Sequence, residues 1–251
     1  MRRLLAALRF LTILPVPGTW GTTEEDLARS VPWFPVVGLL LAALAGAAAW
    51  ALSAAPPMVA AAAVVVLLLG FSGCLHIDGL ADTADGLLSS RPRERALEIM
   101  KDSHAGVMGV TAIVCVLLLK FAALAALASF PAGEFWRAVL LMPLAGRTAL
   151  VVHMAILSYA RPDGLGTVFY RRRPRWAAVW AAALLAVVAW NVLGWRGAIV
   201  WSACMVAALA FSAFVYRRIG GATGDTCGAV CEILEVVPAL TLALSPLGEG
   251  R

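Results

Sequence analysis

VMGVTAIVCVLLLKFAALAALAS, residues 107–129, is an almost unbroken apolar run in which Lys120 is the single charged side chain. A helix needs about 20 consecutive apolar residues to cross the hydrocarbon core of a bilayer, which is ~30 Å thick. Runs of similar length recur along the 251-residue chain, separated by short polar connectors. Because backbone groups cannot remain unpaired in lipid, these runs are predicted to be helices. The predicted spans cover residues 31–54, 58–75, 107–129, 138–158, 176–193, 198–215 and 228–247. The sequence therefore predicts an all-α, polytopic integral membrane protein with about seven transmembrane helices in a single domain, residues 1–251.

The composition narrows the class of protein further. Hydrophobic residues make up 62% of the chain and charged residues only 14%, whereas a soluble domain carries about 25% charged residues. This excludes a disordered chain, a disulfide-stapled secreted module and a soluble enzyme. An odd number of cysteines without CxxC pairs argues against a disulfide framework. We interpret these five residues as small buried hydrophobic side chains: Cys74, Cys115, Cys204, Cys227 and Cys231.

The N-terminal segment is basic and only briefly apolar. The apolar run that follows Arg2 and Arg3 ends at Arg9, which makes it too short for a signal peptide. Residues 2–14 are expected instead to form a short amphipathic helix on the membrane surface. Since no basic helix or aromatic RNA-binding motif occurs, the expected partners are small molecules and the lipid bilayer, with no nucleic acid.

The distribution of basic residues predicts the orientation in the membrane. When alternate connectors are counted, 15 Lys and Arg residues fall on the N-terminal side, in residues 1–30, 76–106, 159–175 and 216–227, and three fall on the other side. The positive-inside rule then places the N-terminus in the cytoplasm. We expect a multi-pass protein of the cell (inner) membrane, in which residues 1–30 are a cytoplasmic segment and residues 76–106 a cytoplasmic acidic segment that holds the active site.

An acidic stretch, HIDGLADTADG (residues 76–86), follows the second predicted span. If that helix continues, Asp78, Asp82 and Asp85 project within about 60° of one another. Like charges four residues apart destabilise a helix, and the stretch contains no basic residue to offset them. A bound cation would do so, and oxygen ligands favour Mg²⁺ held together with substrate phosphates. The alternative is an ordinary solvated acidic helix end.

The next connector ends in KDSHAGVMG, residues 101–109. It places a cation, an acid, a hydroxyl and an imidazole side by side at Lys101, Asp102, Ser103 and His104, followed by glycines whose backbone could contact phosphate. The alternative is a polar helix end with a flexible connector, in which His104 is an interfacial histidine.

A third polar element, GGATGDTCGAVCEILE (residues 220–235), leads into the last predicted span. Asp225 and Glu232 are seven residues apart and share a helix face. Because a carboxylate inside a membrane is costly, Glu232 and Glu235 are expected to have a functional partner. The alternative is that both are structural acids, paired with Arg147 or Lys120.

Basic connectors supply the complementary charge. Arg161, in YARPDGLG (residues 159–166), and the cluster at 171–175 could bind phosphate in a bidentate manner. Topology and anionic lipid headgroups explain the cluster equally well, so Arg161 is the better ligand candidate. His76 and His153 are as readily structural as catalytic.

Together these segments resemble the cobalamin synthase family, the adenosylcobinamide-GDP ribazoletransferases. The resemblance runs nearly end to end, through RFLTILPVP (9–17), FPVVGLLL (34–41), HIDGLADTADGL (76–87), KDSHAGVMG (101–109) and GGATGDTCGA (220–229). It implies a Mg²⁺-dependent membrane enzyme that joins adenosylcobinamide-GDP to α-ribazole or its 5'-phosphate. The products would be adenosylcobalamin, or its 5'-phosphate, and GMP.

The resemblance also implies roles for the residues that match the motifs. Asp78, Asp82, Asp85 and Asp225 would hold the metal, with Lys101 and Asp102 acting beside them. Either Asp85 or Asp102 would accept the proton of the attacking ribose hydroxyl. The remaining matched or neighbouring residues would bind substrate: Arg161, Ser103, His104, Thr223 and Gly224.

A cation-coupled transporter is the competing function. Asp78, Glu232 and Glu235 would then carry ions across the membrane. Two features oppose it: the strongest acidic elements are predicted at one face rather than at the midplane, and the halves of the chain show no visible internal repeat. Release of GMP by the purified protein in the presence of Mg²⁺ would favour the transferase.

Overall fold

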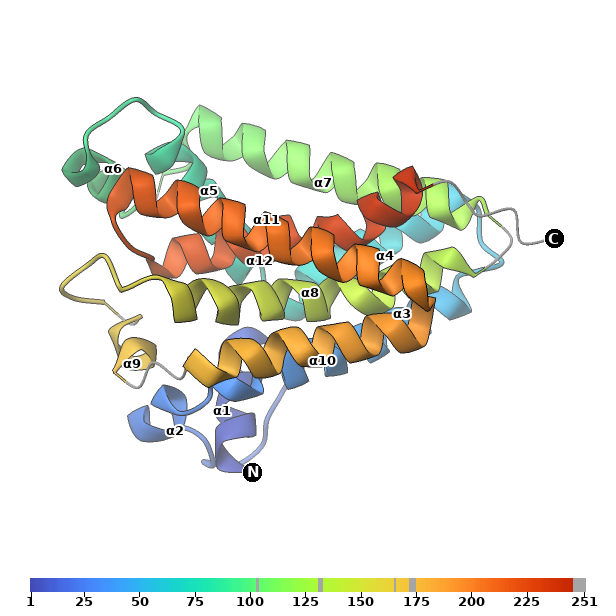
Figure 1. Cartoon of the computed structure of the whole chain (residues 1–251), viewed down its shortest axis with the longest axis horizontal. Helices are drawn as coiled ribbons and strands as arrows, with labels where there is room; N and C mark the ends of the chain where they lie inside the picture. The colour runs from blue at the N-terminus through green and yellow to red at the C-terminus, as the bar shows by residue number, and fades with distance from the viewer. Residues whose placement is uncertain (103, 131–132, 165, 172–174, 246–251) are drawn as a thin grey trace.

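The computed structural model of the chain describes residues 1–102, 104–130, 133–164, 166–171 and 175–245. Helices dominate these residues, and the only β pairing among them is an isolated bridge between Tyr159 and Ala222. Six of the helices are long and apolar enough to cross a membrane, and a bent pair raises the number to seven. The polytopic helical fold predicted from the sequence is confirmed. The six are α3 with the turn before it (Val31–Ala51), α7 (Val107–Ala128), α8 (Glu134–Ile156), α10 (Arg175–Leu193), α11 (Trp195–Ile219) and α12 (Gly224–Leu244) (Figure 1).

The second predicted span is where the structure departs from the sequence-based expectation. Helix α4 (Pro57–Ser72) and helix α5 (Leu75–Leu87) meet at a bend of 90°. The bend lies at two consecutive residues with positive φ, Gly73 at 56° and Cys74 at 62°, and a left-handed residue cannot continue a right-handed helix. The expectation that the acidic stretch continues the helix of the second span is therefore wrong. The stretch forms a helix of its own, and its carboxylates keep their helical spacing.

Two other predicted boundaries shift because buried charges are paired. Residues 138 and 198 were the predicted starts of the fourth and sixth spans, whereas α8 begins at Glu134 and α11 at Trp195. Glu134 is buried, and its carboxylate accepts hydrogen bonds from Arg196 at 3.0 Å and from Arg137 at 3.4 Å. Since each charge has an opposite partner, the two helices can extend past the apolar runs.

Helix α8 is the central helix of the bundle. It packs against α3, α10 and α12, and most of its side chains are buried. Helix α1 (Arg2–Leu11) packs its small face, which includes Ala6 and Ala7, against the start of α3. The predicted N-terminal amphipathic helix is thus present, and part of its apolar face is covered by protein. Within the first span, the turn is η1 (Val31–Trp33) and α3 itself covers Phe34–Ala51. The remaining short elements are α2 (Glu24–Ala28), α6 (Arg93–Ile99) and α9 (Thr167–Tyr170).

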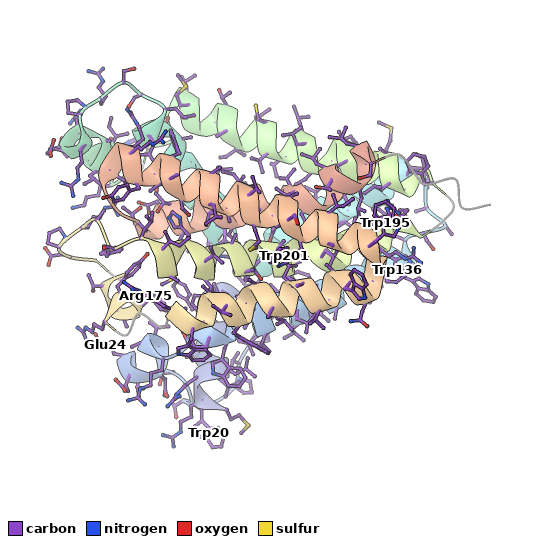
Figure 2. The ribbon with its side chains drawn as sticks, in the orientation of Figure 1. Trp20, Glu24, Trp136, Arg175, Trp195 and Trp201 are labelled. Carbon is purple, nitrogen blue, oxygen red and sulfur yellow. The ribbon has the colours of Figure 1, made fainter. Side chains whose placement is uncertain are left out.

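The connectors sort to the two ends of the bundle as the basic-residue count predicts. Helices α2, α6 and α9 and the turn between α11 and α12 lie at one end, which we call the site end, and the chain's C-terminus lies at the other (Figure 1). Trp136 and Trp195 lie at the end opposite the site end (Figure 2). Exposed tryptophans are typical of membrane–water interfaces, and Trp195 is 65% exposed.

The interpretation of the cysteines holds for three of the five. Cys204, Cys227 and Cys231 are buried, whereas Cys74 and Cys115 are exposed. For those two the interpretation is wrong. Cys74 lies at the bend before α5, and Cys115 lies on an outward face of α7, where a weakly polar thiol is compatible with lipid.

Candidate active site

The site is organised by the crossing of α5 over the start of α12. At Gly79 the two backbones approach so closely that an added Cβ would lie 2.7 Å from the carbonyl oxygen of Asp225. On the α12 side, an added Cβ at Gly228 would lie 3.0 Å from the carbonyl oxygen of His76. A side chain at Gly79 would force the two backbones apart, and one at Gly228 would require a shift of a few tenths of an ångström. The crossing brings the acidic stretch against the third polar element, which follows it by about 140 residues in the chain.

A cavity of about 290 Å³ opens beside this crossing. Five of the residues predicted from the sequence line it: Asp78 from α5, Arg161 from the connector after α8, and Thr223, Gly224 and Asp225 from the start of α12. Charged and polar groups from the acidic stretch, the Arg161 connector and the third polar element thus meet at one cavity, whereas no described residue of the KDSHAGVMG segment lines it. Asp82, Asp85, Lys101, Asp102 and His104 are not among the described residues that line it.

Arg161 is held next to Asp225 by backbone pairing. The Ala160 amide donates to the Ala222 carbonyl at 2.8 Å, and the Ala222 amide donates to the Ser158 carbonyl at 2.7 Å. This pairing fixes the connector after α8 against the turn before α12. Arg161 Nη2 then donates to Asp225 Oδ2 at 2.8 Å, with the two side chains only 12% and 21% exposed. One contact satisfies little of a guanidinium that has five donors, so Arg161 retains donors for an anion.

The first turn of α12 adds an anion-binding feature. Thr223 is its N-cap, and its hydroxyl accepts from the Thr226 amide at 3.2 Å while donating to Asp225 Oδ2 at 3.3 Å. Gly224 lies open, with no atom within 4 Å of the place a Cβ would take. The N-terminal amides of a helix and its dipole favour negative charge. Together with Arg161, they form a surface suited to phosphate.

Asp78 and Asp82 have no ionic or hydrogen-bonding partner for their side chains among the described residues. They lie one turn apart on α5, and the charges that act on Asp82 include Asp225, Asp78 and Arg161. Two unpaired carboxylates next to a third one repel each other. A cation is the natural complement of this arrangement.

Asp85 has a different environment from the other two carboxylates of α5. Its Oδ2 accepts from the Gly106 amide at 2.7 Å, and its Oδ1 accepts from the Gly109 amide at 2.9 Å. Gly106 is the N-cap residue of α7, so the carboxylate caps this helix from across the fold. Both oxygens are committed to the start of a membrane span. The structure gives Asp85 a role that its sequence pattern did not indicate.

In the KDSHAGVMG segment, Lys101, Asp102 and His104 are exposed. The amide and Nδ1 of His104 both lie within hydrogen-bonding distance of Asp102 Oδ1, at 3.1 and 2.7 Å. These hydrogen bonds lower the pKa of Asp102, which makes it a weaker proton acceptor. The side chain of Lys101 is exposed and has no ionic partner among the described residues. Ser103, the remaining predicted residue here, lies outside the described residues.

The carboxylates near the cavity can be compared with the ligands that a metal ion needs. Among the described residues, no three His, Cys, Asp or Glu side chains converge in the way a metal held by protein alone requires. Mg²⁺ does not need this, since it is usually bound through one or two carboxylates together with substrate phosphates. Asp78 and Asp82 supply such carboxylates beside the phosphate-binding surface of Arg161 and α12. The residues therefore fit a Mg²⁺ that binds jointly with a phosphorylated substrate.

The intramembrane acids are paired, as the structural alternative predicted. Lys120 Nζ lies 2.6 Å from Glu232 Oε2 and 2.8 Å from Glu235 Oε2, and Arg147 contacts the other oxygen of Glu235. All four side chains are at most 3% exposed. Two positive and two negative charges make the group neutral. We call it the buried ion cluster.

Two histidines and a tyrosine lie in or near the site. His153 is buried and structural, within 2.9 Å of Ser212 Oγ and 3.1 Å of Thr226 Oγ1. Tyr159 lines the cavity, and burial raises the pKa of its phenol, so the hydroxyl stays protonated. Buried His76 also lines the cavity.

The cavity has a second, aromatic half that sequence reasoning missed. Phe10 from α1, Phe34 from the start of α3 and Phe169 from α9 line it, and we call these three the aromatic wall. Phe10 and Phe34 lie in two segments quoted above for the family resemblance, RFLTILPVP and FPVVGLLL, which offered the one available signal. The aromatic rings carry no charge and fit the pattern of ordinary core residues, so their role depends on the fold.

The fold and the site define a polytopic membrane protein with a cavity lined by charged, polar and aromatic side chains. The family model described as cobalamin-5-phosphate synthase matches residues 3–243. The chain belongs to this family and is a transferase of cobalamin synthesis.

Curated relatives agree with this assignment. The chain is 44% identical over 243 residues to an adenosylcobinamide-GDP ribazoletransferase of Roseiflexus sp., covering 95% of this chain and 88% of the relative. It is 40% identical to one from Pseudomonas putida, covering 96% and 98%. It is 37% identical to one from Geotalea daltonii, covering 96% and 97%. No solved structure matches the chain.

Proposed function

We propose that the protein joins adenosylcobinamide-GDP to α-ribazole or its 5'-phosphate, with Mg²⁺ as the cofactor. The observation that carries the proposal is the meeting of Asp78, Arg161 and Asp225 at one cavity at the start of α12. A pyrophosphate substrate needs cationic and backbone donors for its oxygens, and carboxylates for its metal. This chain provides both groups there, and the relatives named above carry the name of this activity.

The chemistry is a displacement at phosphorus. A ribose hydroxyl oxygen of the acceptor forms a new bond to the phosphorus that bears the cobinamide. The bond from that phosphorus to the bridging oxygen breaks, and GMP leaves with the bridging oxygen and its electron pair. The hydroxyl proton passes to solvent as the new ester forms, so the products are adenosylcobalamin, or its 5'-phosphate, and GMP.

In this proposal each group has a defined part. Arg161 and the first amides of α12 bind the phosphate oxygens and align the pyrophosphate. Asp225 holds the guanidinium of Arg161 in place, and Thr223 donates a hydrogen bond to that carboxylate. A bound Mg²⁺, held by Asp78 and Asp82, would neutralise charge that develops on the leaving oxygens. The structure favours neither Asp85 nor Asp102 as the proton acceptor, because the first is bound to two amides and the second is paired with His104.

The location we propose is the cell (inner) membrane, with the N-terminus and the site end in the cytoplasm. Support comes from the 15 to 3 split of Lys and Arg between the two sides. A nucleotide-linked substrate is then met on the side of the membrane where nucleotides are made.

The deciding experiment uses the purified full-length protein with adenosylcobinamide-GDP, α-ribazole and Mg²⁺. We expect stoichiometric formation of GMP and the joined product, and loss of both in Asp82→Asn. Glu98→Gln, an exposed acid that pairs only with Arg95 on α6, is the matched control and should keep wild-type turnover. If Asp82→Asn kept wild-type turnover at limiting Mg²⁺, Asp82 would not be a ligand of the metal. If the correctly folded wild-type protein formed no product, the proposed reaction would be wrong.

The transporter alternative has less support. Its intramembrane carriers, Glu232 and Glu235, are both engaged by Lys120 or Arg147 in the buried ion cluster. A carboxylate held this way does not exchange ions readily.

A further inference from the structure

The aromatic wall is compact and is built from three distant segments. The ring centroids of Phe10 and Phe169 are 4.7 Å apart, those of Phe34 and Phe169 are 5.8 Å apart, and those of Phe10 and Phe34 are 6.0 Å apart. Phe34 and Phe169 are buried, while Phe10 is partly exposed. The three rings line the same cavity as Asp78, Arg161 and Asp225.

Two tyrosines add to this aromatic lining. The rings of Tyr159 and Tyr170 have centroids 5.1 Å apart, and both line the cavity. The ring of Tyr159 lies against Gly166, where an added Cβ would come within 2.5 Å of it. This close contact limits the movement of the Tyr159 ring. Tyr159 precedes Arg161 by two positions in the sequence. Five aromatic rings therefore surround one cavity that has a charged end.

We propose that the aromatic wall is the subsite for the flat aromatic base of the ribazole. The inference rests on the proposed function, since it names which substrate enters this half of the cavity. Aromatic side chains bind flat aromatic groups by offset stacking and edge contacts. A base placed against Phe10 and Phe169 would direct its ribose toward the charged side, where the displacement takes place.

The size of the cavity limits what it can hold. Small-molecule pockets typically range from about 300 to about 1,000 Å³, and this cavity, at about 290 Å³, falls at the lower limit. That volume suits one nucleoside-sized ligand and is too small for a corrin macrocycle. The corrin of the other substrate must then lie outside the cavity, with its pyrophosphate reaching Arg161.

This subsite also gives α1 a function. Arg9, the neighbour of Phe10, contacts the Gly18 carbonyl and donates to the Trp20 carbonyl at 3.4 Å, which folds the following segment back along the helix. Ala6, Ala7 and Leu11 of α1 are buried. The helix is thereby fixed against the bundle, and Phe10 becomes part of a rigid wall.

The test compares Phe10→Leu with Phe10→Tyr in the full-length protein. Leucine removes the ring and tyrosine keeps it, so both variants should fold, and thermal unfolding checks this. Equilibrium dialysis with α-ribazole measures binding without requiring turnover. We expect about tenfold weaker binding for Phe10→Leu, the order expected for a lost aromatic contact, and near wild-type binding for Phe10→Tyr. Phe130→Leu, an exposed phenylalanine beyond α7, is the control and should bind normally.

A ligand without the base sharpens the test. Ribose 5-phosphate should bind equally well to the wild type and to Phe10→Leu, because the lost contact is with the base. In kinetic assays, KM for the ribazole should rise while KM for adenosylcobinamide-GDP stays constant. Equal weakening for ribose 5-phosphate, or a selective rise in KM for adenosylcobinamide-GDP, would overturn the subsite. If the wild type binds α-ribazole but forms no product, the proposed reaction fails while the subsite stands.

Discussion

Arg161 Nη2 lies 2.8 Å from Asp225 Oδ2, although the two residues are 64 positions apart. The pair joins the connector after α8 to the first turn of α12. It also places a cation and an anion side by side among the residues that line the cavity. We expect the two residues to act as one unit, since each orients the other toward the substrate phosphates.

The first prediction follows from this pairing. Arg161→Ala and Asp225→Asn should each lower kcat/KM by about 100-fold, because either change removes or misplaces a phosphate donor in the cavity. The double variant should be scarcely worse than either single one, as is typical of groups that act together. Arg161→Lys should recover little, since an ammonium lacks the planar fork of a guanidinium.

Arg171→Ala is the control for this cycle. Arg171 pairs with Glu24 on the surface, where both side chains are more than half exposed, and its loss should leave kcat/KM unchanged. Fully additive losses in the double variant would show that Arg161 and Asp225 contribute independently. Asp225 would then have its own function in the site.

A second prediction separates a structural role of Asp85 from a metal-binding one. Asp85→Ala removes the acceptor for the Gly106 and Gly109 amides at the start of α7. The expected cost is about 2 kcal/mol of folding free energy, which corresponds to a fall in Tm of about 4–8 °C for a chain of this size. Thermal unfolding of the detergent-solubilised protein measures it.

Asp102→Ala provides the comparison, because that carboxylate is exposed and, among the described residues, its hydrogen-bonding partner is His104, two positions further on. Its Tm should match the wild type. If Asp85→Ala kept the wild-type Tm but required much more Mg²⁺ for turnover, Asp85 would be a metal ligand after all, and its bonds to α7 would be secondary.

The sequence indicated which charged residues could gather at one site, but not the contact that brings them together. Asp78, Arg161 and Asp225 were chosen for charge, spacing and position at predicted span ends, and the structure brings them to one cavity. Charge placement at the ends of membrane helices is readable from hydropathy alone. The crossing at Gly79 that joins these groups is not, because nothing local in either helix specifies its partner.

Asp85 and the aromatic wall show why the rest could not be predicted. Asp85 has the same spacing as Asp78 and Asp82, yet its carboxylate binds the amides of a helix that begins some twenty residues later in the chain. The 90° bend at Cys74 swings α5 off the line of α4, and only then can it reach α7. Phe10, Phe34 and Phe169 carry no polar atom, so only their convergence distinguishes them from core residues.

The third prediction concerns orientation. In a background with Cys74→Ala and Cys115→Ala, the remaining native cysteines are buried. A membrane-impermeant thiol reagent added to intact cells should then label Ser129→Cys, which follows α7 at the end opposite the site end, and leave Ser90→Cys unlabelled. Both positions are exposed in the structure, so accessibility alone does not separate them. The reverse labelling would place the site end outside the cell.

The last prediction concerns the buried ion cluster. Lys120→Met removes one cation and leaves Glu232 and Glu235 with Arg147 as the single neighbouring cation in the cluster. An uncompensated buried charge costs about 3–5 kcal/mol, so we expect a large drop in Tm and poor membrane accumulation. Lys101→Met, an exposed lysine at the site end, should leave the Tm unchanged.

Adding Glu232→Gln to Lys120→Met should restore most of the lost stability. The second change removes the carboxylate that the first one leaves unpaired, and Arg147 with Glu235 then forms a neutral pair. The double variant should also keep transferase activity, because neither side chain lines the cavity. If it folded well but lost activity, the cluster would have a part in the reaction. If Lys120→Met alone were as stable as the wild type, one of the glutamates would be protonated in the native protein, and the cluster would not be held by full charges.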